Sequence, residues 1–300
     1  MSTRITPLST TASMLADLNS GRRALDEVQR RIASGKQLRQ ASDSPAEAVT
    51  TLDHRARLHR SEQLGRNAEV ATRWLNEADR ALSTVVDRLN AARTALVQAT
   101  SGANDPTSRL ALANQIRALR ESLIETANTS IRGRPILGGT SASPAAYAPD
   151  GTYQGDAGAV SLPISPGVTM TVAATGTEVF GTANLADPAT GDIFQQLDAL
   201  AIAVQNGDTN SIQAGLGQID AATTRVQTVQ VRLGSRSAQL SDLRAAAAAS
   251  DQELASAISE IEDTDLAEAT IQLKSREVAY QASLQVTARF IQLSLMDFLP

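Results

Sequence analysis

Few side chains in this 300-residue sequence are suited to acid–base chemistry or to metal binding. His54 and His59 are the only histidines, and no cysteine is present. Five residues apart on a helix, the two imidazoles lie on different faces and do not form a shared metal site. The lack of cysteine excludes thiol chemistry, disulfides and thiolate-bound metals. We therefore expect no metal and no cofactor.

Three carboxylates lie close together in the stretch EDTDLAEA, which contains Glu262, Asp263 and Asp265. Neighbouring carboxylates can act as a general acid and a general base. They also stabilise the start of a helix, where the helix dipole favours negative charge. Because no pocket-forming motif accompanies them, we interpret them as helix-capping residues, with Thr264 or Asp263 as the cap. The sequence also has no phosphate-binding loop and no nucleophile elbow, so we expect no enzyme activity.

Charge is unevenly spread along the chain, whose formal net charge is −5. The basic residues of the first 40 positions alternate with apolar residues at helical spacing, and no stacking aromatic residues accompany them. We interpret them as the solvated face of a helix and expect no nucleic-acid partner. No run of 18 apolar residues occurs, so we expect no transmembrane helix and no membrane partner. The N-terminal residues lack the apolar core that is typical of a signal peptide.

Apolar residues at coiled-coil spacing organise most of the chain. Between Leu64 and Ala99 they alternate in steps of four and three residues, which predicts a long helix with a continuous apolar seam. A turn at 102–106 leads to a second apolar face over 112–131, so these two helices should be antiparallel neighbours. A seven-residue repeat returns over 219–261, after a shorter helix at about 192–205. We interpret these seams as the intrachain core.

The segment 141–191 differs from the helical parts in composition, with seven Gly, seven Thr and five Pro. Within it, AVSLPI and VTMTVA alternate apolar and polar residues, as half-buried strands do. The sequence therefore predicts a mainly α protein with a small β-rich insert. Its N- and C-terminal halves should build a long antiparallel coiled-coil-like helical bundle.

Both ends of the chain carry apolar stripes at helical spacing. The segment 264–299 has two such stripes and finishes in RFIQLSLMDFLP, the most apolar stretch of the sequence. One partner helix, at 5–34, can cover one stripe, so the other stripe predicts contact with further subunits. The predicted subunit-interface residues are Leu8, Leu15, Leu18, Leu25, Ile32, Leu266, Ile271, Leu273, Val278, Tyr280, Leu284, Phe290, Ile291, Leu293, Leu295 and Phe298.

Breaks in the helical pattern suggest three domains. A break follows Gly35, and a new helix is expected to begin with Ser44 as N-cap, Pro45 at its first position and Glu47 as capping-box partner. The predicted domains are a terminal coiled-coil assembly domain, a helical bundle domain and a β-rich inserted domain. They comprise residues 1–43 with 264–300, residues 44–140 with 192–263, and residues 141–191, respectively.

Several stretches resemble the flagellin superfamily, and they occur in the same order as in that family. They are RIASGKQLRQASDSPAEA (31–48), ATRWLNEADRALSTVVDRLNAARTALVQATSG (71–102), ETANTSIRGRPILGGT (125–140), VRLGSRSAQL (231–240) and the stretch 262–299. The ending SLMDFL and the insert stretch YQGDAGAVSLPISPGVTMTVAATGTEVFG (153–181) are most similar to the hook–filament junction type of hook-associated protein. The chain departs from the family at Pro135 and Leu137, where an aromatic residue is usual, and at Ser44, where a carboxylate or amide is usual.

The resemblance implies a structural component of the bacterial flagellum, an adaptor that joins hook to filament by ring-like self-assembly through its terminal helices. It implies secretion through the flagellar type III apparatus to an extracellular location. The implied partners are further copies of the chain, another hook-associated protein, flagellin and an export chaperone. Two alternatives stay open: flagellin itself, and a soluble signalling coiled coil, which would leave the insert and the two-striped last helix unexplained.

Overall fold

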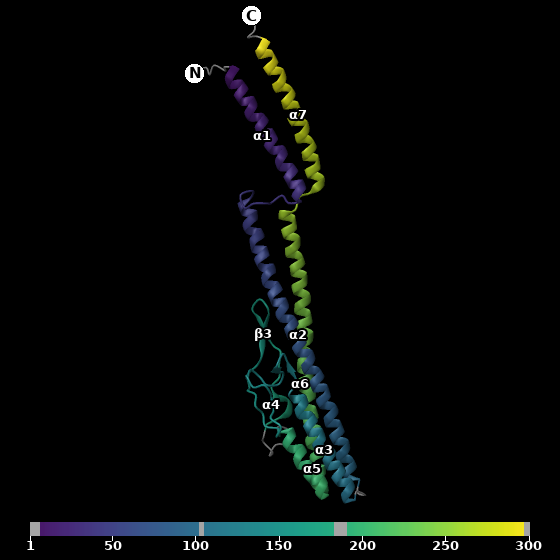
Figure 1. The fold of residues 1–300 in the computed structure, drawn as a ribbon. Helices are drawn as coiled ribbons and strands as arrows, with labels where there is room; N and C mark the ends of the chain where they lie inside the picture. The colour runs from purple at the N-terminus through teal and green to yellow at the C-terminus, as the bar shows by residue number, and fades with distance from the viewer. Residues whose placement is uncertain (1–6, 102–104, 183–190, 297–300) are drawn as a thin grey trace. The chain divides into compact units, whose positions relative to one another are not determined.

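The computed structural model describes residues 7–101, 105–182 and 191–296, and the side chains within 12–101, 105–182 and 191–289 (Figure 1). The chain divides into two compact units. We call the unit formed by residues 1–59 and 250–300 the terminal unit, and the unit formed by residues 60–249 the central unit. Among the described residues, no helix combines the length and apolar character needed to cross a membrane.

The elements follow the order that the sequence predicts. The helices are α1 (Pro7–Ser34), α2 (Pro45–Thr100), α3 (Pro106–Ala127), α4 (Gly176–Phe180), α5 (Ile193–Asn206), α6 (Thr209–Glu262) and α7 (Leu266–Met296). The strands are β1 (Ser130–Ile131), β2 (Arg134–Pro135), β3 (Ser161–Ser165) and β4 (Val168–Thr171), which form the antiparallel pairs β1–β2 and β3–β4. The prediction of a mainly α fold with a small β insert is confirmed.

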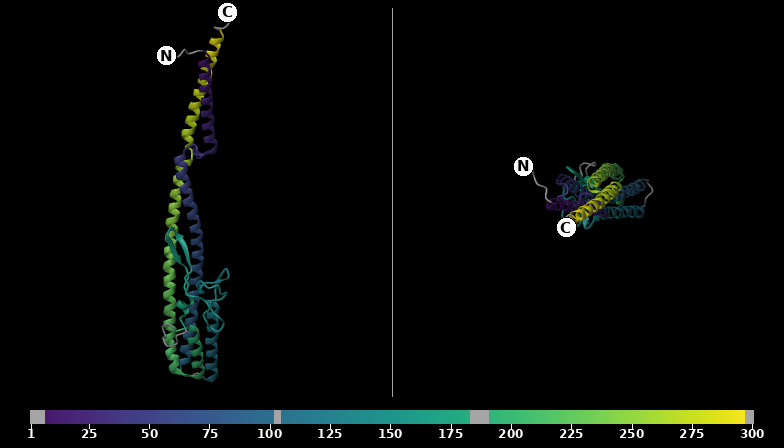
Figure 2. Two further views of the ribbon diagram at one scale, coloured as in Figure 1. Left: turned by 90° about the vertical axis from the view of Figure 1, so that its left-hand side faces the viewer. Right: turned by 90° about the horizontal axis from the view of Figure 1, so that it is seen from above.

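In the central unit α2 and α6 lie side by side and run in opposite directions (Figures 1 and 2). Arg93 Nε donates to Asp220 Oδ1 at 2.8 Å and Gln230 Nε2 donates to Asp79 Oδ1 at 3.0 Å, as an antiparallel pair requires. The predicted seams meet in the core. Their side chains are at most 2% exposed at Ala71, Leu75, Ala78, Leu82, Val85, Leu89, Ala92 and Leu96 on α2, and at Ile219, Val226, Leu233 and Leu240 on α6.

Helices α3 and α5 pack against each other and complete the core of the central unit. Each begins at an aspartate that caps backbone NH groups: Asp105 accepts from Ser108 N at 2.8 Å, and Asp192 accepts from Phe194 N at 2.7 Å. Helix α3 ends at Ala127, so Ile131, which the apolar spacing placed on this helix, lies in β1 instead. The cause is Asn128, which follows the last helical residue. Its side-chain amide donates a hydrogen bond to the Tyr147 carbonyl at 2.9 Å and accepts one from Tyr147 N at 2.8 Å.

The predicted insert shares one hydrophobic core with the helices of the central unit. Four of the eight aromatic residues of the chain meet there: Tyr147, Tyr153, Phe180 and Phe194. The Tyr147 ring centroid lies 5.1, 5.4 and 5.0 Å from those of Tyr153, Phe180 and Phe194. These tilted and edge-on contacts add to the energy of burial. The insert is therefore anchored to α5 by its aromatic residues.

The motif YQGDAG closes a loop of the insert onto the segment after α3. The Asp156 carboxylate accepts from Thr140 N at 2.7 Å and from Gly158 N at 2.9 Å, and the Tyr153 hydroxyl donates to the Leu137 carbonyl at 3.0 Å. The hydrogen bonds to Asp156, first those from Thr140, hold the pKa of this carboxyl below its ordinary value. Tyr153 and Asp156 thus have a structural role.

Candidate assembly site in the terminal unit

Helices α1 and α7 lie side by side in the terminal unit (Figure 2). On α1, Val28 is 7% exposed, and Leu18, Leu25 and Ile32 are half-buried. On α7, Ala269 and Thr287 are buried, and Leu273 and Tyr280 are half-buried. A Cβ atom added at Gly21 would lie 3.5 Å from the Tyr280 ring. One stripe of each helix therefore packs within the chain.

The other stripe of α7 is open to solvent. Ile271 is 71% exposed, Val278 57% and Val286 59%, and these three share one side of the helix. Leu266 and Leu284 on α7 and Leu15 on α1 are also exposed. Full burial of one such side chain is worth about 1.5–3 kcal/mol. A partner that covers this face would therefore gain considerable apolar burial energy.

The predicted interface residues thus fall into three groups. Leu18, Leu25, Ile32, Leu273 and Tyr280 are half-buried in the α1–α7 pair, and Leu15, Leu266, Ile271, Val278 and Leu284 are exposed. For Leu8 in α1, and for Phe290, Ile291, Leu293 and Leu295 in α7, the side chains lie outside the described part, and Phe298 lies outside the described residues altogether. The structure brings the first group together and leaves the second group on the surface.

The end of α1 is joined to the start of α7 by a short antiparallel backbone contact. Gln37 N donates to the Glu262 carbonyl at 2.7 Å, and Thr264 N donates to the Gly35 carbonyl at 2.9 Å, on either side of a β-bridge between Lys36 and Asp263. Gly35 has a φ of 69°, a left-handed conformation that glycine adopts without strain. The break that the sequence predicts after Gly35 is where this contact begins.

Four charged side chains surround the backbone contact, and we call Lys36, Arg55, Glu262 and Asp263 the clasp. The Glu262 side chain is 6% exposed, and its carboxylate pairs with Lys36 Nζ at 2.8 Å and with Arg55 Nη2 at 2.7 Å. Lys36 Nζ also lies 3.1 Å from Asp263 Oδ1. Hydrogen bonds to Glu262 and Asp263 raise the pKa of Lys36 above its ordinary value. Those from Ser259 and Lys36 lower the pKa of Asp263.

The acidic cluster is divided between two roles. Asp265 caps α7, because its carboxylate accepts from Ala267 N at 2.8 Å and from Glu268 N at 3.2 Å. The prediction of Thr264 or Asp263 as the cap is therefore wrong. The long-range contact with Gly35 and Lys36 engages both residues, which moves the cap to the next carboxylate. Helix α2 begins at Pro45 as predicted, after a turn in which Asp43 accepts from Gln40 N at 2.9 Å.

Sequence reasoning missed the clasp as a unit. It singled out Glu262 and Asp263, but gave Lys36 and Arg55 no partner. Lys36 and Glu262 are 226 residues apart and Arg55 and Glu262 are 207 residues apart, so no local spacing indicates either pair. Among the described residues, no group of three or more His, Asp or Glu side chains could hold a metal ion, and His54 and His59 both lie on α2.

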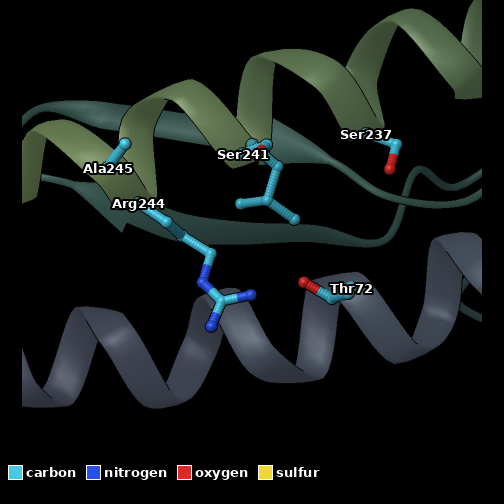
Figure 3. A pocket seen from close by; sticks show the side chains of 6 residues that line it. Thr72, Ser237, Ser241, Arg244 and Ala245 are labelled. Atoms are coloured by element: carbon cyan, nitrogen blue, oxygen red, sulfur yellow. The ribbon is translucent and has the colours of Figure 1, made fainter.

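A groove of 440 Å³ runs between α2 and α6 in the central unit (Figure 3). Thr72 on α2 and Arg244 on α6 point toward each other across it, and Ser237, Leu240, Ser241 and Ala245 complete the α6 side. Small side chains on α6 leave this space above the seam. The lining offers hydroxyl groups and one guanidinium but no general base that would activate a nucleophile.

Comparison with known proteins gives matches over most of the chain. Residues 5–142 match the bacterial flagellin N-terminal helical region, and residues 216–299 match the bacterial flagellin C-terminal helical region. The flagellar hook-associated protein 3 of Salmonella typhimurium is 25% identical over 232 residues, which cover 71% of this chain and 73% of that protein.

Two solved structures have a similar fold. FlgL of Bacillus cereus gives a TM-score of 0.59 at 21% identity, with 69% of this chain and 99% of that chain covered. The flagellar junction protein FlgL of Legionella pneumophila gives a TM-score of 0.56 at 16% identity, with 71% of this chain and 100% of that chain covered.

Proposed function

This chain belongs to the bacterial flagellin family, and on that premise we propose that it is the adaptor that joins the flagellar hook to the filament. In this proposal, copies of the chain form a ring through α1 and α7. One end of the ring contacts another hook-associated protein and the other end accepts flagellin. The protein reaches this extracellular site through the flagellar type III apparatus, with the help of an export chaperone.

The observation that carries the proposal is the exposed apolar face of α7, with Ile271, Val278 and Val286 at its centre. Exposed apolar side chains on one side of a helix are typical of a surface that another protein covers. The similarity to a hook-associated protein over 71% of the chain favours the adaptor over other flagellar roles. The interface residues predicted from the sequence stay proposals, with Ile271 and Val278 as the first to test.

The filament subunit is the second candidate, because the matched helical regions are those of flagellins. Abundance separates the two candidates. A filament subunit recurs along the whole filament, whereas an adaptor is confined to the junction. We expect mass spectrometry of intact, purified flagella to give this chain as a trace component beside an abundant flagellin. Abundance comparable with that of the filament protein would favour the second candidate.

The exposed face can be tested with the double variant Ile271→Asp, Val278→Asp. Each change places a carboxylate where we propose a dry contact, and an unpaired buried charge costs several kcal/mol. Neither side chain is buried in the free chain, so thermal unfolding should shift by less than about 2 °C. We expect the cells to release flagellin into the medium instead of building filaments.

The matched control is Val231→Asp on α6 in the central unit, where Val231 is 74% exposed, close to the 71% of Ile271. This control should keep both its unfolding temperature and its filaments. Normal filaments in the Ile271→Asp, Val278→Asp cells would contradict the proposed interface, whatever the abundance measurement gives.

A further inference from the structure

We propose that the clasp sets the register of the α1–α7 pair, with Glu262 as the positioning residue. In this proposal the clasp fixes the two helices relative to each other where α1 ends and α7 begins. The pair forms stably only when the Glu262 carboxylate bridges Lys36 and Arg55. The inference rests on the terminal unit of the single chain and does not depend on the proposed function.

The packing between α1 and α7 is thin. Among the side chains described in these helices, the buried ones are Val28, Ala269 and Thr287, and all three are small or medium-sized. The remaining contacts are made by half-buried residues such as Leu25 and Tyr280. Helical stability in proteins comes mostly from the packing of an apolar face. The pair therefore needs a further source of order.

The clasp supplies contacts of a different kind. Glu262 is nearly inaccessible to solvent, and its two cationic partners come from the segment after α1 and from α2. Hydrogen bonds to a charged group contribute more than neutral ones, because the charge strengthens the electrostatic attraction between donor and acceptor. The backbone contacts of Gln37 and Thr264 lie directly beside these charges. One carboxylate thus joins three segments of the terminal unit.

The register of the helix pair is consistent with control from the clasp. Gly21 and Tyr280, which face each other across the pair, lie at nearly equal chain distances from Lys36 and Asp263. Because α1 ends and α7 begins at the Lys36–Asp263 contact, residues at similar chain distances from this contact face each other across the pair. If the pairing of Lys36 with Asp263 shifted by one residue, Tyr280 would move away from the small Gly21.

The test is hydrogen exchange of the full, unassembled chain, read by mass spectrometry of its peptides. In Glu262→Gln we expect amide protection in residues 12–34 and 266–289 to fall by about tenfold or more, because the pair opens locally. Protection of the buried seam at residues 68–96 should stay unchanged, which shows that the variant is folded. Lys36→Gln should have the same effect, and Lys36→Arg should restore most of the protection.

The matched control is Glu27→Gln, which removes an exposed carboxylate on α1 that pairs with Arg31 one turn away. This variant should change the protection of α1 and α7 by less than about threefold, as expected for a surface ion pair. The proposal is overturned if Glu262→Gln behaves like Glu27→Gln, if Lys36→Arg is as damaging as Lys36→Gln, or if the wild-type chain gives no protection in α1 and α7.

Discussion

At the scale of single residues, two buried carboxylates make contacts that stabilise the fold. Glu262 joins the segments of the terminal unit, and Asp192 begins α5 in the central unit. Asp192 is 6% exposed, and burial raises its pKa although backbone NH groups and the nearby Arg120 and Arg225 favour its charged form. Its acceptor atoms thus stabilise the fold while its charge costs free energy.

The two effects at Asp192 can be separated by substitution. Asp192→Asn keeps an oxygen that accepts from Phe194 N and Gln195 N, whereas Asp192→Ala leaves both NH groups without this acceptor. We expect Asp192→Ala to lower the free energy of unfolding by about 1–2 kcal/mol at pH 7 and Asp192→Asn to lower it by much less. Urea titration of the three proteins measures the difference, and equal losses would contradict the capping role.

The same residue predicts a pH dependence. Because the pKa of Asp192 is higher in the folded chain than in the unfolded chain, its contribution to stability is complete below the unfolded pKa. That contribution is lost as pH rises through the folded pKa. Asp192→Asn should therefore gain stability relative to the wild type as pH rises from 4 toward 7. A difference that does not change over this range would argue against a raised pKa.

At the scale of elements, helices α5 and α6 approach closely because a glycine faces a buried leucine. A Cβ atom added at Gly215 would lie 2.0 Å from Leu200 Cδ2 and 3.0 Å from Leu200 Cγ, whereas one added at Gly217, on the same helix, has nothing within 4 Å. Leu200 is 3% exposed and has little room to turn away. Gly215 is therefore needed for the close packing of α6 against Leu200, whereas the packing does not require a glycine at position 217.

This contrast gives a matched pair of variants. Gly215→Ala should destabilise the central unit by about 1–3 kcal/mol, because overpacking forces a buried side chain or a helix to move. Gly217→Ala should stabilise it by about 0.5–1 kcal/mol, because alanine is the better helix former and meets no atom. Thermal unfolding followed by circular dichroism separates them, and a shift of the same sign in both would refute the assignment.

The elements that the sequence predicts well are those specified by local periodicity. Leu75, Leu82 and Leu89 repeat along α2 at the coiled-coil spacing, and all three are buried. The aromatic cluster could not be predicted in this way, because no periodic repeat links its members. Tyr147 and Tyr153 pair across one antiparallel bridge of the insert, whereas Phe180 lies in α4 and Phe194 in α5. Beyond Leu240, the apolar repeat residues of α6 are only half-buried, although the seven-residue repeat continues to Ile261. Periodicity indicates which face is apolar, but not whether a partner covers it.

At the scale of the whole molecule, the two units differ in how they are held together. The central unit has a continuous core of apolar side chains, whereas the terminal unit has a thin helix pair and a group of charges. Local opening follows the density of buried contacts, so we expect the terminal unit to open first. The three predicted domains stay a proposal, since the aromatic cluster joins the insert to the helical core.

Limited proteolysis tests this difference in stability. Trypsin sites occur in both units, including Arg22, Arg30 and Lys274 in the terminal unit and Arg88 and Arg93 in the central unit. We expect a short digestion of the unassembled chain to cut before about residue 40 and after about residue 265. The product should be a resistant core that contains residues 60–249. Early cleavage at Arg88 or Arg93, with the terminal sites intact, would contradict the prediction.

The position of Lys36 in the clasp has a consequence for covalent labelling. Lys36 and Lys274 are the only two lysines of the chain, and both belong to the terminal unit. The other basic side chains are arginines and the two histidines. Arginine guanidinium groups stay charged at any ordinary pH, so they do not act as nucleophiles toward acylating reagents. Acylating dyes and lysine cross-linkers therefore modify the side chains of the terminal unit alone. A dye on Lys36 also removes the ammonium group that Glu262 needs, whereas Lys274, with its side chain 79% exposed, accepts a dye without this effect.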